Sequence, residues 1–254
     1  MINGQKIWTS GAHFSDYGVI VVRSDPDALK HKGLTYFFLD MKSPGIEVRR
    51  IKQVSGVSNF NEVFFTDVRI SDSQRLGDVG NGWRVSITTL MNERLAVGER
   101  PAPDFDEIFN LARNLDLEDG PAIGNAAVRE KLASWYIQMQ GLKLTRLRTV
   151  TALSRGAEPG PEASITKVVG GMKHQEIANF GMELMDMVGI MLDDETMPMR
   201  ALFQEALLAS PSGRIAGGTD EILRNIIAER VLGLPPDIRV DKDVSFNELP
   251  QGSG

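Results

Sequence analysis

The stretch Gly80-Asn81-Gly82-Trp83 separates two parts of the chain that differ in their pattern of apolar residues. Before it, five short runs are rich in β-branched and aromatic residues, and turn formers lie between them. Strands that follow one another without crossover helices pair antiparallel. We therefore predict an antiparallel β-barrel or sandwich over residues 1–75. The five runs are residues 6–9, 17–22, 34–39, 46–51 and 61–66.

Helical periodicity begins after Trp83 and continues to about Gly233, with apolar residues three or four positions apart. A long amphipathic helix is predicted over residues 128–153. A second helix should begin after the break at 156–162, and a third should cover 221–232 before the stop signal Gly-Leu-Pro-Pro.

The predicted fold class is therefore multi-domain α and β. The barrel or sandwich of residues 1–75 is followed by an all-α bundle over residues 76–236. Residues 237–254 are a polar tail, which we expect to be a mobile or partner-binding extension.

The composition excludes several classes of protein. The 254 residues carry 28 Lys and Arg against 34 Asp and Glu, so a net charge of −6 gives no bulk positive field for nucleic acid. With no cysteine and three scattered histidines, no metal site is expected. No apolar run is long enough for a membrane span, and no signal-peptide pattern is present. We expect a cytoplasmic protein, or a mitochondrial matrix protein in a eukaryote.

The pair Asn3-Gly4 is a strong two-residue hairpin signal. A hairpin needs a strand on each side, yet only Met1 and Ile2 precede the pair. We therefore expect that the first strands of the barrel are lacking and that the chain is truncated from a larger protein. A frayed surface turn is the alternative.

The common catalytic signatures do not occur, which leaves three polar clusters as candidates for chemistry. The first is Trp8-Thr9-Ser10, at the end of a predicted strand. A tryptophan in this position is usually a core residue. Beside two hydroxyls, however, its ring also suits a flat heteroaromatic cofactor.

The second cluster is Glu93-Arg94, within an otherwise apolar helical stretch, although such a pair is usually a solvated helix face. The third is residues 217–221, Gly-Gly-Thr-Asp-Glu, where two glycines let the backbone approach a ligand. Capping of the following helix would explain the third cluster without any function. The residues alone thus predict a β domain and a helical bundle that bind a cofactor.

Several of these segments resemble the acyl-CoA dehydrogenase family, and they occur in the family's order. They are residues 3–12, 60–69, 80–83, 92–95 and 217–235. The resemblance implies a middle β-barrel followed by a C-terminal four-helix bundle, without the family's leading helical domain. It also implies bound FAD and assembly as a homodimer or homotetramer. A hetero-oligomer with a chain that supplies the missing domain is the alternative.

The resemblance also assigns roles to individual residues. Trp8, Thr9 and Ser10 match the segment that contacts the flavin, and Thr219, Asp220 and Glu221 lie in the family's cofactor-binding step. Arg94, Gly217 and Gly218 are implied to contact the substrate.

The resemblance places the catalytic base at one of two positions. Many family members carry a glutamate immediately before the Gly-Thr step, where this sequence has Gly217. A smaller group carries it on an earlier helix in a Glu-Arg-Leu context, which Glu93 matches. Since a glycine leaves room for a carboxylate from elsewhere, Glu93 is the predicted base. There are two alternatives. Glu93 is an ordinary surface glutamate, or the chain is a subunit that lacks a base and pairs with an active partner.

The implied activity is FAD-dependent α,β-dehydrogenation of an acyl-CoA thioester, with an electron-transferring flavoprotein as redox partner. A related flavoprotein that acts on a steroid side chain, a branched or an aromatic acyl group is a second interpretation. A catalytically inactive partner or scaffold subunit is a third. The acyl group is not determined by this sequence, because the implied acyl slot is built partly by the missing domain.

Overall fold

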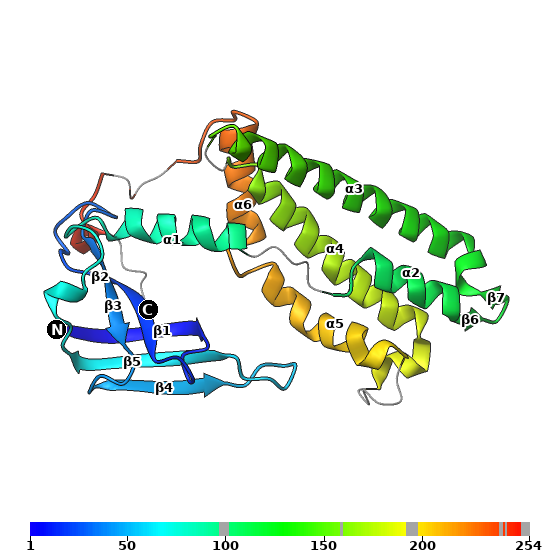
Figure 1. Ribbon diagram of the computed structural model, residues 1–254, viewed down its shortest axis with the longest axis horizontal. Coiled ribbons are helices and arrows are strands. Elements are labelled where there is room, and N and C mark those ends of the chain that lie inside the picture. Colours follow the sequence, from blue (N-terminus) through cyan, green and yellow to red (C-terminus); the bar gives the residue numbers. More distant parts are fainter. Residues whose placement is uncertain (97–101, 158–159, 192–197, 239–240, 242, 250–254) are drawn as a thin grey trace. The chain divides into compact units, whose positions relative to one another are not determined.

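The computed structural model describes residues 1–96, 102–157, 160–191, 198–238, 241 and 243–249, without the side chains of 91–96 and 198. The chain forms two compact units, one of Met1–Gly98 with Asp237–Gly254 and one of Glu99–Pro236. Figure 1 shows the longer strands in the first unit, and the long helices with a short strand pair in the second.

The first unit contains the five predicted strands, all of which pair antiparallel. One sheet has the order β1-β5-β4, and a separate hairpin pairs β2 with β3. The antiparallel fold class is therefore confirmed. The strands are β1 (Ile2–Ser10), β2 (Tyr17–Arg23), β3 (Leu34–Asp40), β4 (Ile46–Ile51) and β5 (Phe60–Val68).

Apolar side chains from both sheets form the core of this unit, among them the fully buried Leu39, Val63 and Val68. After the short 3-10 turn η1 (Asp72–Gln74), helix α1 (Gly82–Ala96) packs on β2 and β3. A Cβ atom at Gly82 would lie 2.7 Å from the backbone of Thr35, so only glycine allows the helix to begin this close to β3. The unit that holds the strands therefore includes α1.

The predicted hairpin at Asn3-Gly4 is wrong, because both residues lie inside β1. The pairing of β1 with β5 shifts between Ile2 and Gly4, where Asp67 adopts a left-handed φ of 51°. The Asn3 amide group donates to Asp67 Oδ1 and accepts from the Asp67 backbone N–H. A bulge between paired strands and a hairpin turn use the same local residue types, so the sequence signal did not distinguish them.

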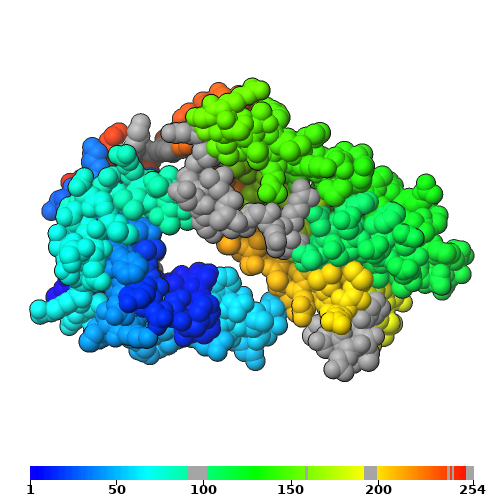
Figure 2. All heavy atoms as spheres, in the orientation of Figure 1, coloured from blue at the N-terminus to red at the C-terminus, as the bar shows by residue number. Residues whose placement is uncertain are grey.

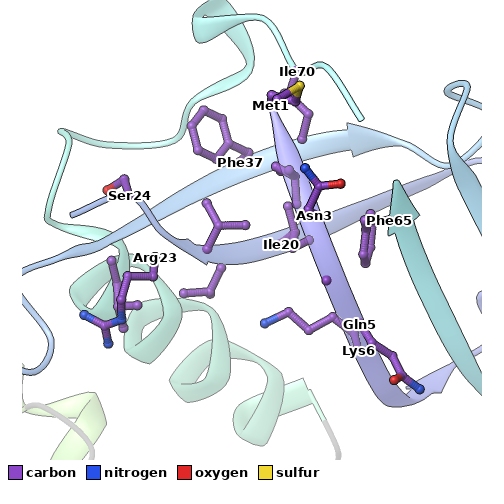
Figure 3. A pocket seen from close by; sticks show the side chains of 15 residues that line it. Met1, Asn3, Gln5, Lys6, Ile20, Arg23, Ser24, Phe37, Phe65 and Ile70 are labelled. Carbon is purple, nitrogen blue, oxygen red and sulfur yellow. The ribbon is translucent and has the colours of Figure 1, made fainter. Parts of the chain in front are cut away.

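Two strand edges of this unit face a common cavity. Among the described residues, β1 pairs only with β5 and β2 only with β3, which leaves one edge of each strand without a partner strand. Both edges line a cavity of about 770 Å³. Figure 3 shows the rings of Phe37 and Phe65 and the side chain of Ile20 along it. Polar side chains, among them Lys6 and Arg23, line the same cavity. Unpaired strand edges are suited to the addition of a further strand.

The described part of the tail contacts the first unit. Ser245 forms a β-bridge with Leu29, and the ring of Phe246, in the 3-10 turn η6 (Phe246–Glu248), lies 3.9 Å from the Arg23 guanidinium. Lys30 also forms an ion pair with Asp241. These contacts hold the described tail residues, 241 and 243–249, against β2 and the loop that follows it. This part of the tail is therefore not the free extension that the sequence predicts.

The second unit is helical, and its central element is α4, which contacts α2, α3, α5 and α6. The predicted helices at 128–153, after 162 and at 221–232 correspond to α3, α4 and α6 with its π-helical continuation η5. The helices are α2 (Phe105–Asn114), α3 (Ala126–Ser154), α4 (Ala163–Leu184), α5 (Leu202–Gly213), α6 (Asp220–Ile226) and η5 (Ile227–Val231). Between them lie β6 (Asp116–Leu117), β7 (Gly120–Pro121), η2 (Ala122–Gly124), η3 (Asp186–Ile190) and η4 (Pro198–Ala201).

Large apolar side chains from four helices meet in the core of this unit. Ile108, Trp135, Ile177 and Phe203 come from α2, α3, α4 and α5, and each is at most 2% exposed. On the face seen in Figure 2, α2 and α3 (green) form a continuous surface. No helix in the described parts of the chain is both long and apolar enough to span a membrane.

Candidate functional site

Trp8 lies at a bulge in the first unit. Ile7 and Trp8 together oppose the single residue Glu62 on β5, and Trp8 takes a left-handed φ of 60°. A bulge of this kind redirects the side chain from the plane of the sheet. The Trp8 side chain is 59% exposed and packs edge-on against Phe60. Trp8 is therefore exposed at the surface of this unit, and the strand bulge fixes the direction of its side chain. It is not a core residue.

Asn61 fixes the strand end beside this ring. It is fully buried, and its side-chain amide donates to the Thr9 carbonyl oxygen at 2.8 Å. Its Oδ1 lies 3.1 Å from Nδ1 of His13. Asn61 was not among the predicted site residues, although it alternates with the apolar Val63 and Phe65 in its strand, and a polar residue in that series was a usable signal.

The surface formed by Trp8, Thr9 and Ser10 suits a flat, polar ring system. The tryptophan ring is accessible, Ser10 is exposed, and Phe14 and Tyr17 add exposed aromatic surface nearby in the chain. Aromatic rings with adjacent hydroxyls can stack on a flat heterocycle and donate hydrogen bonds to it. The exposed Trp8 ring is therefore compatible with the flavin role predicted for this segment, and the roles of Trp8, Thr9 and Ser10 stay predictions.

The predicted base falls outside the described side chains. The backbone of Glu93 and Arg94 is helical, near the end of α1. The structure does not describe their side chains, so the roles of base and substrate contact stay predictions.

In the second unit, residues 217–221 form a loop that enters α6. Gly217 and Gly218 have φ values of 66° and 103°, which side-chain-bearing residues rarely adopt. Thr219 caps α6, since its hydroxyl accepts from the Ile222 backbone N–H at 3.3 Å. The Glu221 side chain is exposed; its own backbone N–H, followed by the Thr219 hydroxyl, holds the pKa of this carboxyl below its ordinary value.

The carboxylate of Asp220 is buried behind this loop and carries two basic partners. Its side chain is 3% exposed, with Oδ2 2.7 Å from Arg214 Nε and Oδ1 3.5 Å from Lys167 Nζ. Burial by itself would raise the pKa of Asp220. The hydrogen bond and charge of Arg214, with the charge of Lys167, have a larger opposite effect, so the pKa of this carboxyl lies below its ordinary value. The structure therefore places an ionised carboxylate beneath the loop. The roles of Thr219, Asp220 and Glu221 in cofactor binding stay predictions.

Two family models match successive parts of the chain, and the boundary between them falls before α1 rather than after it. Residues 1–68 match the middle domain of acyl-CoA dehydrogenase, and residues 80–232 match its C-terminal domain. The chain belongs to the acyl-CoA dehydrogenase family. Members of this family bind FAD.

Related proteins of this family include several from mycobacteria. The chain is 37% identical to acyl-CoA dehydrogenase FadE34 of Mycobacterium tuberculosis over 92% of its own length and 31% of that protein. It is 35% identical to acyl-CoA dehydrogenase IpdE1 of Mycolicibacterium smegmatis, over 94% of this chain and 59% of that protein. The chain thus spans 31% of the first of these relatives and 59% of the second.

A solved structure shares the fold. The Tcur3481-Tcur3483 steroid ACAD superposes with a TM-score of 0.81 at 26% identity, over 92% of this chain and 61% of that one. Both the predicted family and the predicted fold are therefore confirmed.

The ion cluster at Asp220 predicts an acid-sensitive contribution to stability. Because the pKa is lower in the folded chain, the stabilisation is complete above the unfolded value of about 3.9 and is lost as the pH falls through the folded value. We expect Asp220→Asn to be less stable than the parent at pH 7, with the difference shrinking towards pH 2. The measurement is urea unfolding of the second unit, followed by Trp135 fluorescence in a Trp8→Phe, Trp83→Phe background. A difference that does not depend on pH would contradict the assignment.

Proposed function

We propose that this chain supplies the middle and C-terminal parts of an FAD-dependent acyl-CoA dehydrogenase. The observation that carries the proposal is the accessible Trp8 ring, set by a strand bulge beside Thr9 and Ser10, in a chain of this family. These three residues would hold the flavin ring. When bound, FAD supplies the acceptor for the hydride that leaves the β-carbon of the substrate.

Glu93 is the base in this proposal. Its carboxylate would take the α-proton of the acyl-CoA and become a carboxylic acid, while a double bond forms between the α- and β-carbons. An apolar helical context favours this role, because desolvation raises the pKa of a carboxylate towards the working pH. The α-proton is weakly acidic, so the thioester oxygen must be held by preorganised donors.

Gly217 and Gly218 would provide space for the substrate. Gly217 occupies the position at which many family members carry their glutamate. A Cβ atom there would meet nothing within 4 Å of the chain's own atoms. A glycine at this position supplies no carboxylate, so the base must be another residue, and Glu93 is the residue that we propose. Arg94 beside Glu93 is the remaining proposed substrate contact.

A bulky acyl group is one substrate class of this proposal, and the name of one solved relative supports it. The solved relative named steroid ACAD shares 26% identity over 92% of this chain. A CoA thioester of a steroid side chain is therefore the substrate class to test first. An electron-transferring flavoprotein as the redox partner is part of the same proposal.

A second polypeptide, or a second copy of the chain, completes the protein in this proposal. The unpaired edges of β1 and β2 flank a cavity, and α3 exposes Ile137, Leu144 and Leu147. The two names joined in Tcur3481-Tcur3483 support assembly with a different chain. Apolar surface of this extent is usually covered by a partner.

Trp8→Ala should lower the flavin content of the purified chain, because it removes the ring that would stack on the cofactor. The measurement is the visible flavin band per mole of protein, after equilibration with added FAD. Trp83→Ala is the matched control, since Trp83 is also exposed but stacks on His31. An equal loss of flavin content in Trp8→Ala and Trp83→Ala would show a general effect on folding and not a contact with the cofactor. A parent chain that takes up no FAD would favour the inactive partner subunit.

Glu93→Gln should lower turnover by about 10²–10⁴-fold while flavin content is retained, because the amide cannot accept the proton. Turnover is measured with a panel of CoA thioesters and an artificial electron acceptor. Glu130→Gln, at an exposed position on α3, should leave turnover unchanged. Undiminished turnover in Glu93→Gln would remove this residue from the mechanism.

Light scattering of the purified chain at micromolar concentration should give a mass above that of a monomer, because a partner is needed to cover the strand edges and the α3 face. A well-behaved monomer would contradict this part of the proposal. Co-purification with a second polypeptide in stoichiometric amount would identify the assembly as a hetero-oligomer.

A further inference from the structure

The loop at residues 217–219 is tied to α4 by side chains that the proposed reaction does not use. Lys167, on the first half of α4, donates from Nζ to the Gly218 carbonyl oxygen at 2.7 Å. The same Nζ lies 3.5 Å from Oδ1 of Asp220. A single ammonium group therefore contacts the residue before Thr219 and the residue after it.

Arg214 holds the other side of the loop. Its Nε donates to Asp220 Oδ2, and its Nη1 donates to Gln175 Oε1 on α4 at 3.0 Å. The Arg214 carbonyl oxygen also accepts from the Asp220 backbone N–H at 3.1 Å. The two ends of the loop are thus joined to each other and to α4.

Such anchoring is needed because the loop has little stiffness of its own. Gly217 and Gly218 are consecutive glycines with positive φ, and glycine loses more conformational freedom on ordering than any other residue. The helix that follows, α6, has only seven residues. The hydrogen bond from the Lys167 ammonium group to the loop offsets this loss of conformational freedom, and the buried Asp220 carboxylate holds the ammonium group in place.

We propose that Lys167 and Arg214 are positioning residues, which act through Gly218 and Asp220 to hold the 217–219 loop in the form that receives the acyl-CoA. The inference rests on the proposed function for the role of the loop in the reaction. The anchoring itself is a property of this chain. Neither side chain is required to touch the substrate.

The test replaces Lys167 with Met, which keeps the length of the side chain and removes both contacts. Amide hydrogen exchange over 218–223 should become faster by about tenfold or more, because a hydrogen bond to a charged group is lost. Exchange in α2 should not change. Turnover with a steroid side-chain CoA thioester should fall by about tenfold with flavin content retained.

Two further variants separate positioning from a general structural effect. Lys167→Arg should restore slow exchange and turnover together, because it keeps a cationic donor. Lys131→Met, at an exposed position on α3, should change neither. If Lys167→Met does not fold, Lys167→Gln takes its place, since it keeps a neutral donor for the Gly218 carbonyl and should show an intermediate rate of exchange.

If the rate of amide hydrogen exchange over 218–223 in Lys167→Met is within about twofold of the parent rate, Lys167 does not anchor the loop. Faster exchange with unchanged turnover would overturn the role in the reaction. If the parent chain oxidises no CoA thioester, the proposed function fails, and the exchange measurement still decides whether Lys167 anchors the loop.

Discussion

The burial of α4 among four other helices is the constraint on which the helical unit depends. Its apolar face contributes Ile177 to a core shared with Trp135 and Phe203, each almost inaccessible to solvent. Close packing fixes the rotation of the helix about its axis, because a turned helix would bury polar side chains. That rotation decides where Lys167 and Gln175 lie, and therefore where the loop before α6 is held.

The first unit uses a different means to fix its surface. Two irregularities in the pairing of β1 with β5 interrupt an otherwise regular ladder, and the second of them includes Trp8. Buried Asn61 bonds to the Thr9 carbonyl and so holds the strand end after the bulge. In each unit, a buried polar side chain, Asn61 or Asp220, thus helps to fix an irregular segment that carries the candidate contacts.

Much of the fold was predictable from local patterns. The five strands, both ends of α3 and the start of α4 were predicted within a few residues, because alternation and helical periodicity are properties of short stretches. Asn3-Gly4 was misassigned as a hairpin, since the register that makes it part of a strand depends on Asp67, which is distant in sequence. Neither Asn61 nor Lys167 was selected, because their partners lie about fifty residues away.

The sequence by itself determined the order of a β part and a helical part, the family, and the residue types at Trp8, Glu93 and Gly217. These features are encoded in composition, periodicity and short motifs. Only the tertiary structure decided that Trp8 is exposed and that Asp220 is a buried, doubly paired carboxylate. The physical reason is that burial and ion pairing depend on which distant residues meet, and this is settled by the packing of whole elements.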